Sequence, residues 1–253
     1  MKKYIDWKMF FILLGLSLVS IVCVFPYVLT VQGDIISKIG IPIEIIFAAQ
    51  FLQSAILFSV AIFFGLILTK KIDFRLPLLE SISEKGKPME ILKNILGKSV
   101  IFGIIVAVSI YVVDAVFTWL GASVSTHQNY APVWQKLLAA VYGGATEEIL
   151  MRLFLMSLFI WIGMKLFRRS RPTHSGIVIS IVLAAVIFGL GHLPITASLT
   201  RIDSLVVIRA VVLNGIGGVV FGWLFWKKGL ESAMIAHFTA DVFLLTLLPL
   251  IFE

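Results

Sequence analysis

Charged residues are scarce in this chain of 253 residues. Only 14% are Asp, Glu, Lys or Arg, whereas soluble domains carry about 25%, and the mean hydropathy is +1.05. This composition leaves too little polar surface for a soluble globular domain. Cysteine is also nearly absent: Cys23 is the only one, so no disulfide can form within the chain.

The apolar runs lack the alternation of apolar and polar residues that a transmembrane β-barrel needs. Most runs are close to the ~20 residues that cross the hydrocarbon core of a bilayer as a helix. Helices are also the form in which each segment satisfies its own backbone hydrogen bonds in lipid. We therefore expect an all-α polytopic bundle of about seven transmembrane helices, with eight as the alternative. The predicted spans are 9–31, 45–69, 100–120, 131–167, 176–191, 205–226 and 233–252.

The net charge of +7 would suit a nucleic-acid-binding protein, but the excess Lys and Arg lie in loops, where they set membrane topology. We therefore expect a lipid bilayer and no nucleic acid as the partner. The uneven distribution predicts a cytoplasmic N-terminus. The predicted inner side holds Lys2, Lys3, Lys8, Lys70, Lys71, Arg75, Lys85, Lys87, Lys93, Lys98, Lys165, Arg168, Arg169, Arg171, Lys227 and Lys228, and the outer side only Lys38, Lys136, Arg201 and Arg209.

The sequence contains no internal repeat, low-complexity tract or linker. The chemistry-bearing residues lie in the later helices, so we divide the chain at residue 130. Residues 1–130 are predicted to hold N-terminal transmembrane helices and a basic interfacial segment, with a surface helix such as 88–96. Residues 131–253 are predicted to form the helical domain that carries the function.

Ionisable residues within the predicted fourth span form the first cluster, Glu147, Glu148 and Arg152. Each costs about 2.5 to 3.5 kcal/mol inside a bilayer, so such residues face the protein interior or a water-filled cavity. Glu148 and Arg152 are four residues apart and share a helix face, which predicts an ion pair. Glu147 points about 100° away and is free to face a cavity. The alternative is that all three residues only hold helices together.

Two further clusters carry histidine. Phe188 and His192 share a face at the end of the fifth run, and His237 and Asp241 share a face in the seventh. Asp241 could orient His237 and fix its tautomer, or both could contact a substrate oxygen. A structural hydrogen-bonded pair is the alternative. Asp114 in the third run is a lone acid, either a contact between helices or a proton site, and we favour the contact between helices.

The three motifs, Glu-Glu-x-x-x-Arg, Phe-x-x-x-His and His-x-x-x-Asp, together resemble the CAAX protease and bacteriocin-processing family, also called CPBP or Abi. Its eukaryotic members are the type II CAAX prenyl endopeptidases. The resemblance covers about residues 131–250. It implies an intramembrane endopeptidase that cleaves a membrane-associated peptide or protein, prenylated in the eukaryotic members, and it implies the cell membrane of a prokaryote as the location.

The resemblance also implies roles for the residues. Glu147 would be the general base that activates water, His192 would hold that water, and His237 and Asp241 would stabilise the oxyanion. Glu148 and Arg152 would support them. The family has been described both as metal-dependent and as glutamate-dependent without metal, so a divalent metal such as zinc, held by Glu147, His192 and His237, is one option. Asp241 departs from the Asn that is usual in eukaryotic members, which leaves its role open.

Two other function classes remain open. The buried carboxylates could serve as a relay in a proton-coupled transporter, or the chain could be a non-catalytic membrane scaffold. A zincin-type zinc site is not supported, because no His-Glu-x-x-His occurs. Straight helices with the predicted ends would also place His192 near the outer face and His237 roughly 7 Å from the inner face. The two histidines could then meet only if helices tilt, break or re-enter.

Overall fold

The computed structural model describes residues 5–122 and 131–252. Within these residues the chain is helical without strands, and seven helical segments are long and apolar enough to cross a membrane, which confirms the predicted all-α polytopic fold. Lys2 and Lys3 lie outside the described residues, as does the predicted boundary at residue 130. The protein is therefore an integral, multi-pass membrane protein.

The first three spans are single long helices. They are α1 (Trp7–Lys38), α2 (Ile43–Ile72) and α4 (Pro88–Trp119), and the short α3 (Pro77–Ser83) precedes α4. Asp6 caps α1 by accepting hydrogen bonds from the backbone N–H groups of Lys8 and Met9. The separate surface helix predicted at 88–96 is wrong. Pro88 begins α4, a proline suits the first helical position, and the chain continues into the span without a break.

The fourth span, Val133–Leu166, changes helix type along its length. It comprises α5 (Val133–Tyr142), the π-helical segments η2 (Gly143–Glu147) and η3 (Ile149–Met156), and α6 (Ser157–Leu166). π-Helical turns are rare and are frequent at functional sites. The change of helix type therefore marks the part of the span that holds Glu147, Glu148 and Arg152.

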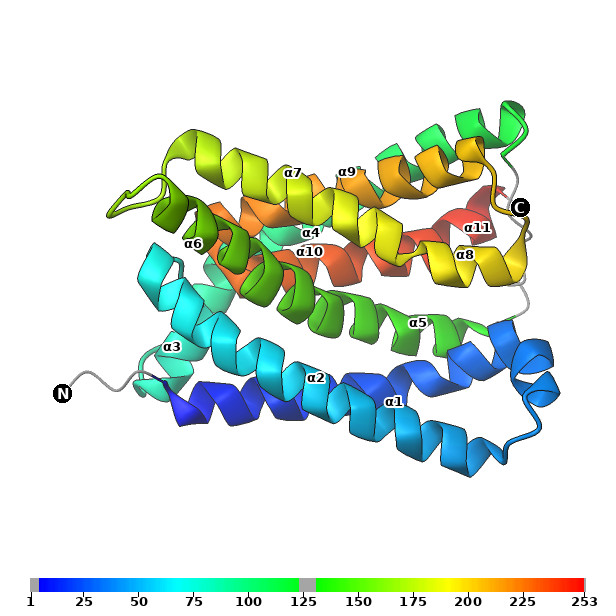
Figure 1. Cartoon of the computed structure of the whole chain (residues 1–253), viewed down its shortest axis with the longest axis horizontal. Coiled ribbons are helices and arrows are strands. Elements are labelled where there is room, and N and C mark those ends of the chain that lie inside the picture. Colours follow the sequence, from blue (N-terminus) through cyan, green and yellow to red (C-terminus); the bar gives the residue numbers. More distant parts are fainter. Residues whose placement is uncertain (1–4, 123–130, 253) are drawn as a thin grey trace.

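The last three spans complete the bundle. They are α7 (His174–Gly191) with α8 (Leu193–Leu199), then α9 (Ser204–Lys228), and finally α10 (Leu230–Val242) with η4 (Phe243–Leu247) and α11 (Leu248–Phe252). Figure 1 shows α7 and α9 crossing at the top of the view, with α10 between them and α5. Helices α7 and α9 approach so closely that a Cβ at Gly218 would lie 2.6 Å from that of Ala185.

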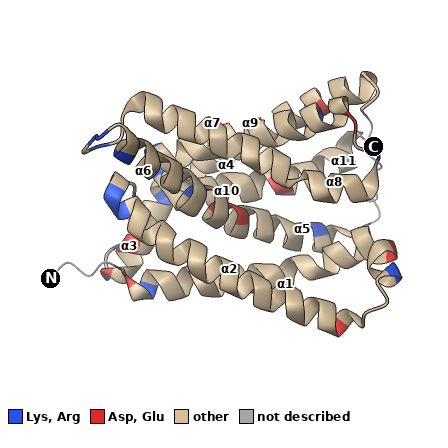
Figure 2. Cartoon of the chain, in the orientation of Figure 1, with Lys and Arg blue, Asp and Glu red and all other residues tan. Residues whose placement is uncertain are grey.

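Apolar side chains on the outside of the bundle match a lipid environment. Along α2, for example, Leu52, Ile56 and Phe64 are exposed. Figure 2 shows Lys and Arg gathered at the end of the bundle where the N-terminal end of the chain lies, and few charges along the middle of the helices. This distribution separates a basic end, with the turns α6–α7 and α9–α10, from an opposite end with the turns α1–α2 and α8–α9.

Candidate active site

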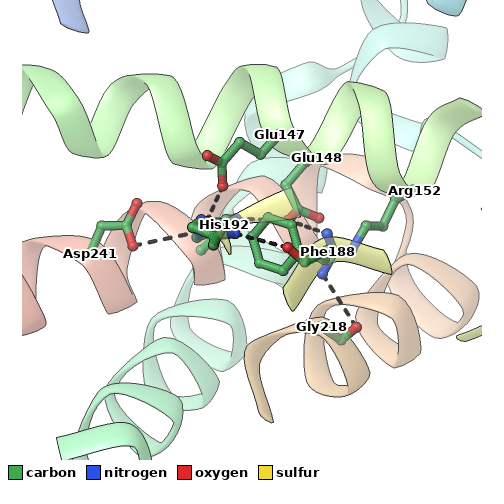
Figure 3. Close-up of polar contacts among 8 residues, drawn as sticks. Glu147, Glu148, Arg152, Phe188, His192, Gly218 and Asp241 are labelled. Atoms are coloured by element: carbon green, nitrogen blue, oxygen red, sulfur yellow. Dashed lines mark hydrogen bonds and ion pairs between the residues drawn. The ribbon is translucent and has the colours of Figure 1, made fainter. Parts of the chain in front are cut away.

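The three predicted motifs meet in the middle of the bundle. Figure 3 shows the side chains of Glu147, Glu148 and Arg152 projecting from the fourth span toward His192 and Asp241. The fourth span approaches α10 closely because Gly143 has no side chain: a Cβ there would collide with the Asp241 carboxylate. The glycine therefore allows carboxylates from two helices to share one small volume.

His237 is the centre of this arrangement. Its Nδ1 lies 2.7 Å from Glu148 Oε1, and its Nε2 lies 3.7 Å from Glu147 Oε2 and 3.6 Å from Asp241 Oδ1. The ring stacks on Phe221, with 4.6 Å between ring centroids. The side chain is 7% exposed, so the ring has a fixed orientation. Glu148 holds the Nδ1 edge of the ring and Asp241 lies at the Nε2 edge, so an orienting role of Asp241 stays one of the predicted alternatives.

The predicted ion pair between Glu148 and Arg152 is present. Arg152 Nη1 lies 3.2 Å from Glu148 Oε1, and both side chains are almost fully buried. The guanidinium also donates from Nη2 to the carbonyl of Gly218 at 3.3 Å and lies over the rings of Phe188 and Phe221. Arg152 thus compensates the charge of the carboxylate that orients His237.

His192 lies at the end of α7, where α8 begins. Its Nδ1 is 2.8 Å from the carbonyl oxygen of Phe188. A carbonyl oxygen only accepts hydrogen bonds, so Nδ1 carries the proton in this contact and the Nε2 of a neutral ring is left with its lone pair. The Phe188 ring makes a T-shaped contact with each histidine ring, with centroid distances of 4.7 Å to His192 and 5.9 Å to His237.

The predicted depth conflict between the two histidines came from a wrong span end. The fifth span runs to Leu199, beyond the predicted end at residue 191. The helix breaks at His192, and a new helix, α8, follows it. Pro194 suits the first turn of α8, because that turn needs no backbone N–H donor from it. The extra residues add about 10 Å of helix beyond His192, so His192 lies within the bundle and shares one cavity with His237.

This cavity has a volume of about 340 Å³. It extends from His237 toward the end of the bundle opposite the basic end, and it contains His192, Asp241, the ion pair of Asp114 with Arg209, and apolar side chains of four spans. The other lining residues are Val106, Ile110, Tyr111, Phe188, Ile195, Thr196, Leu199, Ala210, Leu213, Asn214, Gly217, Phe221, Ala240, Leu244, Leu245 and Pro249.

Glu147 does not line this cavity, although the sequence predicted that it could face one. Because η2 packs directly on α10, its carboxylate meets the Nε2 edge of His237 instead. The Glu147 side chain is 24% exposed, compared with 0% for Glu148. The two adjacent glutamates therefore differ: Glu148 is enclosed by its partners, whereas Glu147 keeps access to other molecules.

The metal option finds no support in the described residues. Among residues 5–122 and 131–252, no group of three or more His, Cys, Asp or Glu side chains is arranged to hold a metal ion. Glu147, His192 and His237, the ligand set that the resemblance implies, therefore do not form such a group.

Two features were missed by sequence reasoning. Phe221, which stacks on His237, reads in the sequence as an ordinary apolar residue, and no spacing rule connects it to a histidine on another helix. Arg209 was counted only among the charges of the outer side, yet it lies within α9 and its Nε donates to Asp114 Oδ1 at 2.6 Å. Its position inside the run 205–226 was a signal for this placement, and the predicted interhelical contact of Asp114 is confirmed.

The comparison with protein families agrees with the motifs. A family model described as type II CAAX prenyl endopeptidase Rce1-like matches residues 129–243. The predicted resemblance is confirmed. The matched residues contain every member of the site, and they are similar to a CAAX-type membrane peptidase. No curated protein and no solved structure matched the chain.

Proposed function

We propose that this protein is an intramembrane endopeptidase that hydrolyses a peptide bond of a membrane-associated protein or peptide, with Glu147 as the general base. The observation that supports it most is the convergence of Glu147 and Asp241 on the Nε2 edge of His237, at 3.7 and 3.6 Å from that nitrogen. This convergence lies inside residues that are similar to a family of membrane peptidases.

In the proposed mechanism, Glu147 removes a proton from a water molecule as that water attacks the peptide carbonyl carbon. The same carboxyl group then returns the proton to the nitrogen of the leaving amine. His192 assists by accepting a hydrogen bond from the water at Nε2, since its Nδ1 proton is engaged with Phe188. The exposure of Glu147 is compatible with this role, because a general base must reach water and substrate.

His237 and Asp241 are proposed to face the oxygen of the tetrahedral intermediate. While Nδ1 donates to Glu148, the imidazolium form of His237 can donate from Nε2 to that oxygen. An ionised Asp241 would repel an oxyanion, so Asp241 contributes only in its protonated form, as a second donor. Glu148 and Arg152 are positioning residues that hold the His237 ring.

We also propose a cytoplasmic N-terminus and a prokaryotic cell membrane as the location. The basic end would then be cytoplasmic, and the cavity would lead to the outer face. Thr196→Cys, which lines the cavity, and Ser83→Cys, at the basic end, test this orientation. In whole cells of a Cys23→Ser background, a membrane-impermeant maleimide should label the first variant and not the second. The reverse pattern would overturn the orientation.

The function is tested by incubating purified protein in detergent with a library of fluorescence-quenched peptides. Wild type should cleave a subset, and Glu147→Gln should lower kcat by about 100- to 10,000-fold while its thermal unfolding stays unchanged. Glu44→Gln, an exposed carboxylate in the first turn of α2, serves as the matched control. Full activity of Glu147→Gln would refute the mechanism. Glu147-dependent proton flux in proteoliposomes without hydrolysis would favour a transporter.

A further inference from the structure

The cavity that contains His192, His237 and Asp241 has one permanently cationic side chain among its described lining residues. That side chain is Arg209, at the part of the cavity farthest from the basic end. It is 18% exposed, and its partner Asp114 is 35% exposed. A guanidinium inside a mostly apolar cavity requires an anionic partner, and Asp114 pairs with only one of its nitrogens.

Asp114 contacts the guanidinium through a single nitrogen. The contact joins Arg209 Nε to Asp114 Oδ1 at 2.6 Å, and no other hydrogen bond or ion pair of Arg209 is found in the described part of the chain. Within the described residues, the two terminal amino groups, with four N–H donors, have no partner. A planar pair of donors at a fixed spacing matches both oxygens of one carboxylate. Asp114 thus orients Arg209 and leaves this edge open.

The position of Arg209 along α9 gives its approximate distance from His237. Phe221, which stacks on His237, lies on the same helix. The helical rise from Phe221 back to Arg209 is about 18 Å at 1.5 Å per residue. An extended peptide covers that distance with about five residues. A peptide in the cavity could therefore reach both places at once.

We propose that Arg209 binds a carboxylate of the substrate, about five residues from the bond that is cleaved. The assignment of this carboxylate to a substrate rests on the proposed function, but the binding itself does not require hydrolysis. The carboxylate has two sources, the C-terminus of the peptide or an Asp or Glu side chain. The apolar lining between Arg209 and His237 suits apolar residues between the carboxylate and the scissile bond.

The test measures binding of three acetylated peptides of about six apolar residues to the full chain in nanodiscs. One peptide has a free C-terminal carboxylate, one has a C-terminal amide, and one has the amide with Glu as its last residue. Glu147→Gln serves as the background, so that no peptide is cleaved during the titration. The carboxylate peptide should bind at least about tenfold more tightly than the plain amide. The Glu peptide shows whether a side-chain carboxylate suffices.

Arg209→Gln should abolish the difference between acid and amide, and Arg209→Lys should keep part of it, because lysine lacks the planar pair of donors. Arg201→Gln, in the loop at the same end of the bundle, should change nothing. Because Arg209→Gln leaves Asp114 without a cation, the double variant Asp114→Asn/Arg209→Gln repeats the test with a neutral pair.

Three results would overturn the proposal. They are equal affinity of the Glu147→Gln background for acid and amide, a preference that survives the addition of Arg209→Gln, and failure of the acid peptide to bind at all. A preference that disappears when phosphatidylglycerol replaces part of the phosphatidylcholine would mean that Arg209 binds a lipid phosphate. If the acid preference depends on Arg209 but no peptide is ever hydrolysed, the carboxylate site stands and the proposed function fails.

Discussion

Two ion pairs within the bundle show how the same chemistry serves different purposes. The pair of Glu148 with Arg152 is almost fully buried, and both members have further partners. The pair of Asp114 with Arg209 is partly exposed, and the guanidinium keeps a free edge. The difference indicates that the first pair fixes the site, whereas the second presents a charge to the cavity.

The largest expected difference between the two pairs is the loss of stability when the arginine of each pair is removed. Arg152→Met removes the permanent countercharge of the buried Glu148 and leaves it only the contact with His237, which should lower the free energy of unfolding by about 3 to 5 kcal/mol. Arg209→Met should lower it by no more than about 1 kcal/mol, because its partner stays in contact with the cavity. Unfolding in mixed detergent micelles measures both. Equal losses would remove the distinction between the two pairs.

Gly143→Ala should disturb the site without removing any polar group. The added Cβ would collide with the Asp241 carboxylate, so the fourth span and α10 must separate or Asp241 must turn away. We expect kcat to fall at least about tenfold, since small displacements of a site are costly. Gly163→Ala is the matched control, because no atom lies within 4 Å of a Cβ at Gly163. Normal activity of Gly143→Ala would show that this close approach is not needed.

Neutralising both members of the buried pair should have a smaller effect on stability than removing Arg152 alone. In Glu148→Gln/Arg152→Met no unpaired charge remains, so the double variant should be more stable than Arg152→Met by about 0.5 to 3 kcal/mol. Its activity should stay low, because His237 loses its charged partner at Nδ1. A double variant that is the less stable of the two would mean that the residues act independently.

The sequence was sufficient for the spans and for contacts within one helix. Hydropathy located all seven spans, and the four-residue spacing predicted the ion pair of Glu148 with Arg152. The start of α4 was missed because Lys93 and Lys98 interrupt the apolar run there. The end of the fifth span was missed because Thr196 and Ser198 follow His192. Hydropathy detects the apolar part of a helix, not its full length.

Contacts between helices could not be predicted in the same way. The motifs indicated that His237 belongs to the site, but only the packing places Glu148 on its Nδ1 and Phe221 on its face. The same packing separates the two neighbouring glutamates into an enclosed and an accessible one. The division of the chain at residue 130 stays a prediction, as do the individual roles of the site residues.

The central claim is that Glu147 and His237 act together on one hydrolytic reaction. It is tested most directly by comparing kcat/KM of wild type, Glu147→Gln, His237→Gln and the double variant on one cleaved peptide. Residues that act as a unit show non-additive losses, so the double variant should be no slower than the slower single variant. A double variant that loses the product of the two single losses would contradict the account.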